Sequence, residues 1–120
     1  MPLATLTLLS MLSGAPALPA RYLALGDSYT IGEAVAAAER WPNQLATMLR
    51  EQGANLARPE IVARTGWNCD ELAAALDAVE RGEAVEMAAA EHAARPAPPY
   101  QLAALLIGVN NQYRGRPVDE

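Results

Sequence analysis

Residues 21–30 read RYLALGDSYT, and an apolar run in this stretch ends abruptly at a glycine, an acid and a hydroxyl. A short apolar run bounded by a turn residue is typical of a buried strand, so we expect a strand over residues 22–25. Gly26 permits the tight turn that would follow it. The stretch therefore predicts a strand whose end displays the hydroxyl of Ser28, with Asp27 in the turn between them.

The rest of the chain alternates between helix-like and strand-like patterns. Apolar residues recur at i, i+4, i+7 and i+8 from Trp41, which is the spacing of one helix face, and Gly53 suits the end of that helix. The expected helices cover 41–52 and 70–81, and the second continues over 83–94 after a break at Gly82. The further expected strands cover 59–63 and 102–107. Residues 29–40 are expected to form a loop or an irregular helix.

The order strand, helix, strand, helix, strand predicts an α/β fold with a parallel sheet between two layers of helices. Ligands of such sheets bind beyond the carboxyl ends of the strands. Three polar or glycine-rich segments follow those ends, at 26–28, 65–68 and 108–111. We expect the fold to bring these three segments together.

These segments contain the groups that acyl transfer needs, a nucleophile and hydrogen-bond donors for the developing oxyanion. Ser28 supplies a hydroxyl and a backbone N–H, Gly66 an unhindered backbone N–H, and Asn110 a side-chain amide. We assign Asp27 and Trp67 to the border of the substrate. For Asp27 a turn or helix-capping role stays open, and for Trp67 a place in the core.

Three blocks of sequence resemble the SGNH hydrolases, also called GDSL esterases: GDSYTIGE at 26–33, the segment around Gly66, and IGVNNQYRGR at 107–116. The resemblance covers about residues 20–118 and implies an SGNH or flavodoxin-like α/β/α domain with strand order 2-1-3-4-5. It implies hydrolysis of a carboxylic ester or thioester through a seryl acyl-enzyme, with Ser28 as nucleophile and no cofactor or metal. The partner is then a small-molecule ester.

The sequence departs from this family pattern in two places. The third block often reads Gly-x-Asn-Asp, whereas Asn111 stands in the last position here and puts a local support in doubt. The family's Asp-x-x-His block, which supplies the base and its orienting acid, is absent. His92 is the sole histidine, residue 89 is alanine, and we expect His92 to be a surface residue of a helix.

We therefore expect residues 21–120 to be the N-terminal part of an SGNH hydrolase domain, truncated after the third strand. Residues 102–107 would then form an exposed apolar edge, which favours aggregation. Two alternatives stay open: a catalytically inactive remnant or small-ligand-binding module of the same fold, and a flavodoxin-like nucleotide binder. Gly26 lacks the partner glycines of a phosphate-binding loop, which argues against the second.

Composition limits the remaining functions. The 120 residues are globular in composition, with 52% hydrophobic residues and a net charge of -5, which argues against nucleic acid as a partner. All nine cations are arginine. Tyr113 and Arg114 are expected at the loop surface, and a place at the border of the site stays open for them. A single cysteine, Cys69, excludes an intrachain disulfide. The sequence predicts no oligomeric state.

Residues 1–20 carry no charged side chain, and their apolar part is too short to span a bilayer. They form an apolar leader or a signal peptide without the usual basic start. We favour a cytoplasmic location and expect no stable membrane insertion. Export to the periplasm or the medium through this segment stays open.

Overall fold

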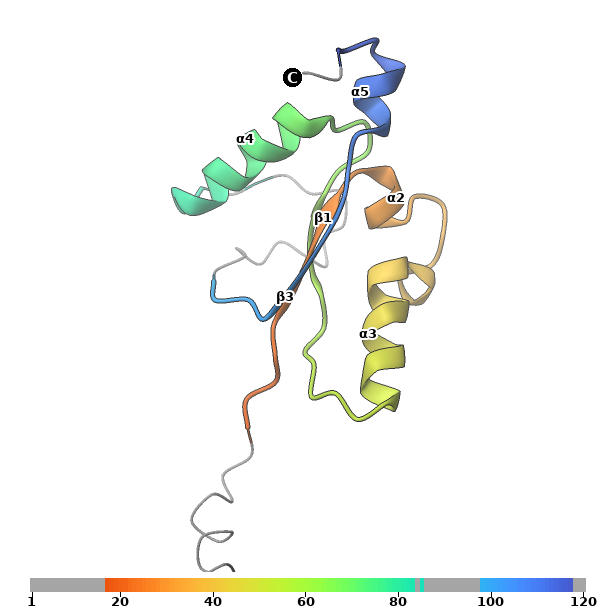
Figure 1. Ribbon diagram of the computed structural model, residues 1–120, viewed down its shortest axis with the longest axis vertical. Helices are drawn as coiled ribbons and strands as arrows, with labels where there is room; N and C mark the ends of the chain where they lie inside the picture. Colours follow the sequence, from red (N-terminus) through yellow and green to blue (C-terminus); the bar gives the residue numbers. More distant parts are fainter. Residues whose placement is uncertain (1–16, 84, 86–97, 118–120) are drawn as a thin grey trace, which may run out of the picture.

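The computed structural model describes residues 17–83, 85 and 98–117 (Figure 1). Its three strands are β1 (Tyr22–Gly26), β2 (Glu60–Ala63) and β3 (Leu102–Leu106). They form one parallel sheet in the order β2-β1-β3, with Ala24 opposite Ile61 and Ala104. The predicted parallel sheet is confirmed, and its order matches the first three strands of the order that the resemblance implies.

The helices connect these strands and lie on both faces of the sheet. They are α2 (Ser28–Ile31), α3 (Trp41–Glu51), α4 (Cys69–Glu80) and α5 (Val109–Tyr113), together with a 3₁₀ turn, η1 (Ala37–Glu39). The helix predicted from Trp41 is confirmed, and Gly53 follows it at a φ of 95°. The second helix begins one residue earlier than predicted, and most of its predicted continuation over 83–94 lies outside the described residues.

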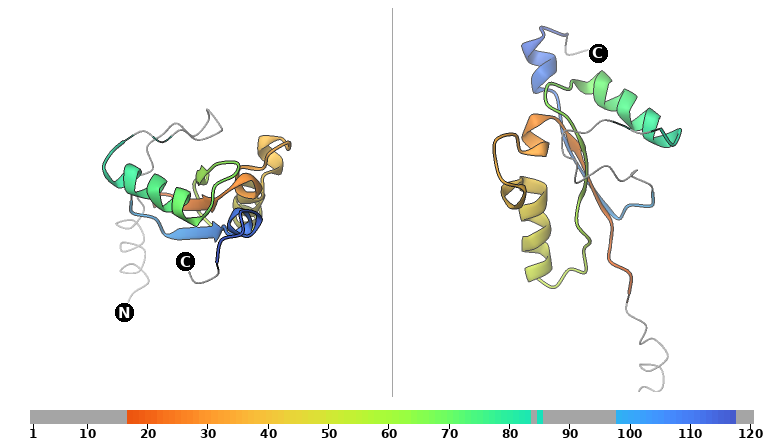
Figure 2. Two further views of the ribbon diagram at one scale, coloured as in Figure 1. Left: turned by 90° about the horizontal axis from the view of Figure 1, so that it is seen from above. Right: turned by 180° about the vertical axis from the view of Figure 1, so that it is seen from behind.

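Alternation along the strands divides the core into two clusters. Tyr22 and Ala24 of β1 belong to a cluster that includes Ala46 of α3, whereas Leu23 and Leu25 pack against a cluster that includes Leu72 of α4. Successive side chains of a strand point to opposite faces, so the two helices must cover opposite faces. Figure 2 shows α3 and α4 on the two sides of the sheet, which confirms the three-layer α/β/α fold.

Gly26 is required for a different reason from the one expected. Its φ is not in the left-handed region that six other glycines occupy. A methyl group at this position would instead collide with Oγ1 of Thr30 and come within 2.5 Å of the carbonyl oxygen of Leu106. Gly26 therefore lets α2 and β3 approach the end of β1 closely, and the turn geometry does not depend on it.

The apolar edge expected at the third strand is present. Within the described residues β3 pairs only with β1, and the side chains of Leu105 and Leu106 are 65% and 47% exposed. None of the helices in the described ranges is long and apolar enough to cross a membrane. Residues 1–16 of the expected leader and His92 fall outside the described residues.

Candidate functional site

Ser28 is the first residue of α2, immediately after the carboxyl end of β1. Asp27 caps this helix, because its Oδ1 accepts a hydrogen bond of 3.0 Å from the backbone N–H of Tyr29. The cap is buried, with Asp27 only 1% exposed, so the capping role that the sequence left open is confirmed. Ser28 itself is half-buried, and no described residue accepts a hydrogen bond from its hydroxyl.

Gly66 lies in the loop between β2 and α4 at a φ of 85°, a conformation that favours glycine. No described residue accepts a hydrogen bond from its backbone N–H or from that of Ser28. The carbonyl oxygen of Gly66 accepts a 2.7 Å hydrogen bond from Nη2 of Arg114. The peptide groups of Gly66 are therefore positioned while its N–H stays available.

Asn110 lies in the first turn of α5, after β3. Its Nδ2 donates a 2.8 Å hydrogen bond to the backbone carbonyl of Trp67. An amide nitrogen carries two hydrogens, so one donor remains for another acceptor. The Trp67 side chain packs against the α4 cluster of Val62 and Leu72, which is the core position that the sequence left open for it.

Further bonds join α5 and the residues after it to the start of α4. Nη1 of Arg114 lies 3.0 Å from Oε1 of Glu71, and Arg116 pairs with Asp70. Oδ1 of Asn111 accepts a 3.0 Å hydrogen bond from the backbone N–H of Cys69. Asn111 stands where the family often has aspartate, and its amide oxygen is a sufficient acceptor for a backbone N–H. The local support that this difference put in doubt is therefore present.

The loop after β1 is joined to the same assembly. The hydroxyl of Thr65, in the β2–α4 loop, donates a 3.2 Å hydrogen bond to Oε2 of Glu33, which follows α2. The segments after β1 and after β3 are thus each hydrogen-bonded to the loop after β2. Sequence reasoning predicted that these segments meet, and the structure confirms it.

Arg114 lies at the surface, as expected, with 46% of its side chain exposed. It also bonds both Gly66 and Glu71, which places it at the border of the site. Tyr113 beside it is 79% exposed, as expected. The available signal was position: Arg114 lies four residues after Asn110, so the two share one face of a short helix.

The carboxylate of Glu71 is held in its charged form. The backbone N–H of Asn68 donates to it at 2.8 Å, and the backbone N–H of Glu71 donates to Oδ1 of Asn68, so the two residues form a capping box. The hydrogen bond from Asn68, followed by that from Arg114, lowers the pKa of Glu71. The start of α4 therefore carries a fixed negative charge that neutralises Arg114.

A cavity of about 240 Å³ lies at the carboxyl ends of β1 and β3, and Ser28 itself does not line it. It is lined by Asp27 and Tyr29, the two neighbours of Ser28 in the sequence, and by Leu106, Ile107 and Val109 from the end of β3. The lining is mostly apolar. Within the described ranges there is no histidine, and no group of three or more His, Cys, Asp or Glu side chains is arranged to hold a metal ion.

No protein-family profile matches the sequence, and a search of curated proteins finds no match. The fold is nevertheless similar to solved structures. The crystal structure of AlinE4, an SGNH-hydrolase family esterase, superposes with a TM-score of 0.59 at 24% identity, over 86% of this chain and 47% of that one. Two mutants of the same esterase match at TM-scores of 0.59 and 0.58, with 24% and 21% identity and the same coverage.

The chain spans about half the length of these esterases. The similarity shows that this chain shares the α/β/α fold of SGNH-type esterases over most of its described length. The esterase relationship is structural, and the roles of individual residues have to be argued from their own geometry.

Proposed function

We propose that residues 21–117 form the nucleophile and oxyanion-binding half of a serine ester hydrolase site. The observation that carries the proposal is the joining of the three loops around the carboxyl end of β1. Ser28, Gly66 and Asn110 come from three separate loops, and each retains at least one hydrogen-bond donor without a partner among the described residues. Convergent unpaired donors beside a serine hydroxyl suit acyl transfer.

In the proposed reaction Oγ of Ser28 attacks the carbonyl carbon of a carboxylic ester or thioester. The hydroxyl proton passes to a general base, the carbonyl oxygen becomes an oxyanion, and the alcohol or thiol leaves with a proton. Water then hydrolyses the acyl-enzyme. The backbone N–H groups of Ser28 and Gly66 and the second amide hydrogen of Asn110 stabilise the oxyanion in both steps.

Arg114 is a positioning residue in this proposal. It touches no reacting atom, but its bond to the carbonyl of Gly66 fixes the loop that presents the Gly66 N–H. Asn110 is similarly fixed by its bond to the carbonyl of Trp67. Donors that are held in place before the reaction need no reorganisation when the oxyanion forms.

The general base lies outside the described residues in this proposal, because none of them accepts a hydrogen bond from the Ser28 hydroxyl. We assign it to a histidine of an Asp-x-x-His block in a downstream part of the protein. The apolar cavity beside Ser28 suits a short alkyl or acyl group. No cofactor takes part in the proposed chemistry.

The first test is turnover of a short nitrophenyl ester by the protein at its natural length. We expect Ser28→Ala to lower kcat/KM by roughly 10⁴-fold or more, as loss of a catalytic serine does. Gln112→Ala, an exposed position of α5 that makes no side-chain hydrogen bond, serves as the control. Full activity in Ser28→Ala would contradict the proposal.

Residues 1–120 expressed alone should not turn over the ester. Turnover by this chain that Ser28→Ala abolishes would show that the base lies within it and would contradict the half-site. The inactive-remnant alternative differs at natural length: it predicts that a fluorophosphonate probe leaves Ser28 unlabelled, whereas an activated serine reacts.

The oxyanion role of Gly66 has a matched control. Gly66 and Gly53 both have positive φ, and a methyl group would have open space at Gly53 and its nearest neighbour 3.9 Å away at Gly66. Alanine should therefore cost similar backbone strain at both, about 1–2 kcal/mol. Alanine retains the backbone N–H, so only strain at Gly66 can displace this donor: Gly66→Ala should also lower kcat, by up to roughly 10²-fold, whereas Gly53→Ala should not.

A further inference from the structure

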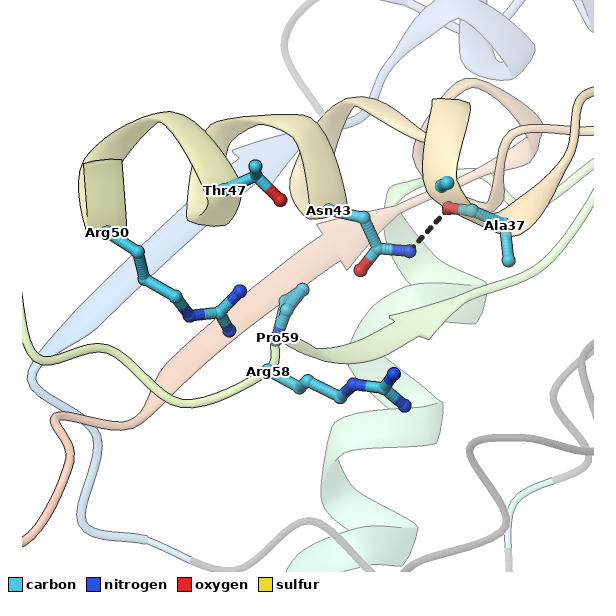
Figure 3. Close-up of a pocket in the computed structure, with 7 residues that line it drawn as sticks. Ala37, Asn43, Thr47, Arg50, Arg58 and Pro59 are labelled. Carbon is cyan, nitrogen blue, oxygen red and sulfur yellow. Dashed lines mark hydrogen bonds between the residues drawn. The ribbon is translucent and has the colours of Figure 1, made fainter.

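A second cavity lies at the other end of the sheet, away from Ser28. Its volume is about 350 Å³, and it is enclosed by η1, α3 and the segment before β2. Figure 3 shows Asn43, Thr47 and Arg50 extending from α3 on the side that faces Arg58 and Pro59. It shares no residue with the cavity beside Ser28, and its volume falls in the range of small-ligand pockets, about 300–1,000 Å³.

The two arginines of this cavity differ from most others in the described part of the chain. Arg81, Arg114 and Arg116 each form an ion pair with a carboxylate. Arg50 and Arg58 pair with no carboxylate among the described residues, and no acidic side chain lines the cavity. Two cations of a chain of net charge -5 thus line one cavity, and no carboxylate of the described residues lines it with them.

The donors of both arginines are available. Nε of Arg50 donates a 2.6 Å hydrogen bond to the carbonyl of Leu56, which fixes the side chain and leaves its two terminal nitrogens free for a ligand. Arg58 makes no hydrogen bond within the described residues. Guanidinium groups match the oxygens of phosphate and carboxylate in geometry as well as in charge.

The cavity also presents an acceptor. Nδ2 of Asn43 donates a 2.6 Å hydrogen bond to the carbonyl of Ala37, which commits the amide nitrogen. Figure 3 shows the amide oxygen of Asn43 turned toward Pro59, into the cavity. That oxygen accepts a hydrogen bond from a ligand hydroxyl, and the hydroxyl of Thr47 can either donate or accept.

We propose that this cavity binds a small oxyanion of charge -2 that carries a hydroxyl group, of which hydrogen phosphate is the simplest example. Two unpaired guanidinium groups match a double negative charge, because a monoanion would leave one of them without a partner. The Asn43 oxygen favours hydrogen phosphate over sulfate, which has the same charge but no hydroxyl. This inference is independent of the proposed esterase activity.

The test is titration of the protein at its natural length with sodium phosphate at pH 8 and constant ionic strength, followed by isothermal titration calorimetry. We expect saturable binding of phosphate, binding of sulfate at least fivefold weaker, and acetate weaker again. Arg58→Gln should weaken phosphate binding at least tenfold, and Arg58→Lys should restore part of it. Arg81→Gln, which removes an exposed arginine paired with Glu83, is the matched control and should leave the binding unchanged.

Two outcomes of this experiment would overturn the proposal. Equal binding of phosphate by wild type, Arg58→Gln and Arg81→Gln would mean general attraction to the surface and no site at this cavity. Equal binding of sulfate and phosphate would contradict the role of the Asn43 oxygen. Arg58 is the variant of choice because it makes no hydrogen bond to any described residue, so Arg58→Gln should unfold at the same denaturant concentration as wild type, and a loss of binding then reports on the site.

Discussion

The two ends of the sheet use their arginines in different ways. At the carboxyl end Arg114 and Arg116 pair with Glu71 and Asp70, and they hold the loops around Ser28 together. At the amino end Arg50 and Arg58 line a cavity without an acidic partner. The contrast indicates that charge at the first end is used to fix loops, whereas charge at the second end remains available to a ligand.

The largest expected effect is at Gly26, where the carboxyl end is packed most closely. A methyl group there has no room between Thr30 and the carbonyl of Leu106, and a backbone carbonyl cannot move cheaply. We expect Gly26→Ala to lower the free energy of unfolding by about 3 kcal/mol or to prevent folding. Chemical denaturation followed by circular dichroism measures the change.

The control for this prediction is at the amino end of the sheet, where α3 ends. Gly53→Ala meets no atom within 4 Å and should cost only the strain of its positive φ, about 1–2 kcal/mol. Equal losses in the two variants would show that close packing is not what Gly26 provides.

The next effect is at Arg114, whose two hydrogen bonds join α5 to Gly66 and Glu71. Arg114→Gln removes an exposed ion pair and a charged hydrogen bond to a backbone carbonyl. We expect a loss of about 1–2 kcal/mol in the free energy of unfolding. Because the Gly66 loop loosens, kcat of the natural-length protein should fall more than KM rises.

Arg81→Gln is the matched control, since Arg81 pairs with Glu83 at the surface and holds no loop. It should change stability by less than about 0.5 kcal/mol and leave kcat unchanged. If Arg114→Gln also leaves stability and kcat nearly unchanged, the arginines at the carboxyl end of the sheet stabilise the fold no more than an exposed arginine such as Arg81 does.

A smaller effect is expected from pH. The pKa of Glu71 is lowered in the folded state, so this residue adds stability above the unfolded pKa of about 4.3 and loses that contribution as pH falls through the folded value. The protein should therefore lose stability from below about pH 4.5. Glu71→Gln should be less stable than wild type at pH 6, and the difference should shrink at pH 3.

Thermal unfolding of both proteins across this pH range measures the effect. The side chain of Glu71 is 42% exposed, so solvent weakens the contribution and we expect it to stay below about 1 kcal/mol. A difference between the two proteins that does not vary with pH would mean that the charge of Glu71 does not hold the loops.

The smallest effect is expected at Arg58. Since it has neither an acidic partner nor a hydrogen bond in the described part of the chain, Arg58→Gln should leave the free energy of unfolding within about 0.5 kcal/mol of wild type. A loss above 1 kcal/mol would show that this arginine stabilises the fold and is not reserved for a ligand.

The strands and the two longer helices were predicted from the sequence because their patterns are local. Alternation and apolar runs place strands, and the spacing of Trp41, Leu45, Met48 and Leu49 places α3. The capping box of α4 is local as well, since Asn68 and Glu71 are three residues apart. The meeting of the three loops followed from the rule that carboxyl ends of parallel strands share one edge.

The incorrect predictions concern residues whose partners are distant in the chain. Gly26 was expected to permit a turn, but its role depends on Leu106, in a strand that lies beside it only in the folded state. Arg114 lies at the surface as expected, but its bonds to Gly66 and Glu71 were not predicted, because these partners are 48 and 43 residues away in the sequence. The cavity lined by Arg50 and Arg58 had no sequence signal, since these two residues belong to no motif.

The sequence by itself determined the three strands and the two longer helices, that the sheet is parallel, and that Ser28 follows the end of a strand. The elements have local patterns in the sequence, and their alternating order implies a parallel sheet. The tertiary structure alone decided which side chains hold the site. Arg114 reaches Glu71 and Gly66 across 43 and 48 residues of sequence, and only the packing of β3 beside β1 brings those residues within hydrogen-bond distance.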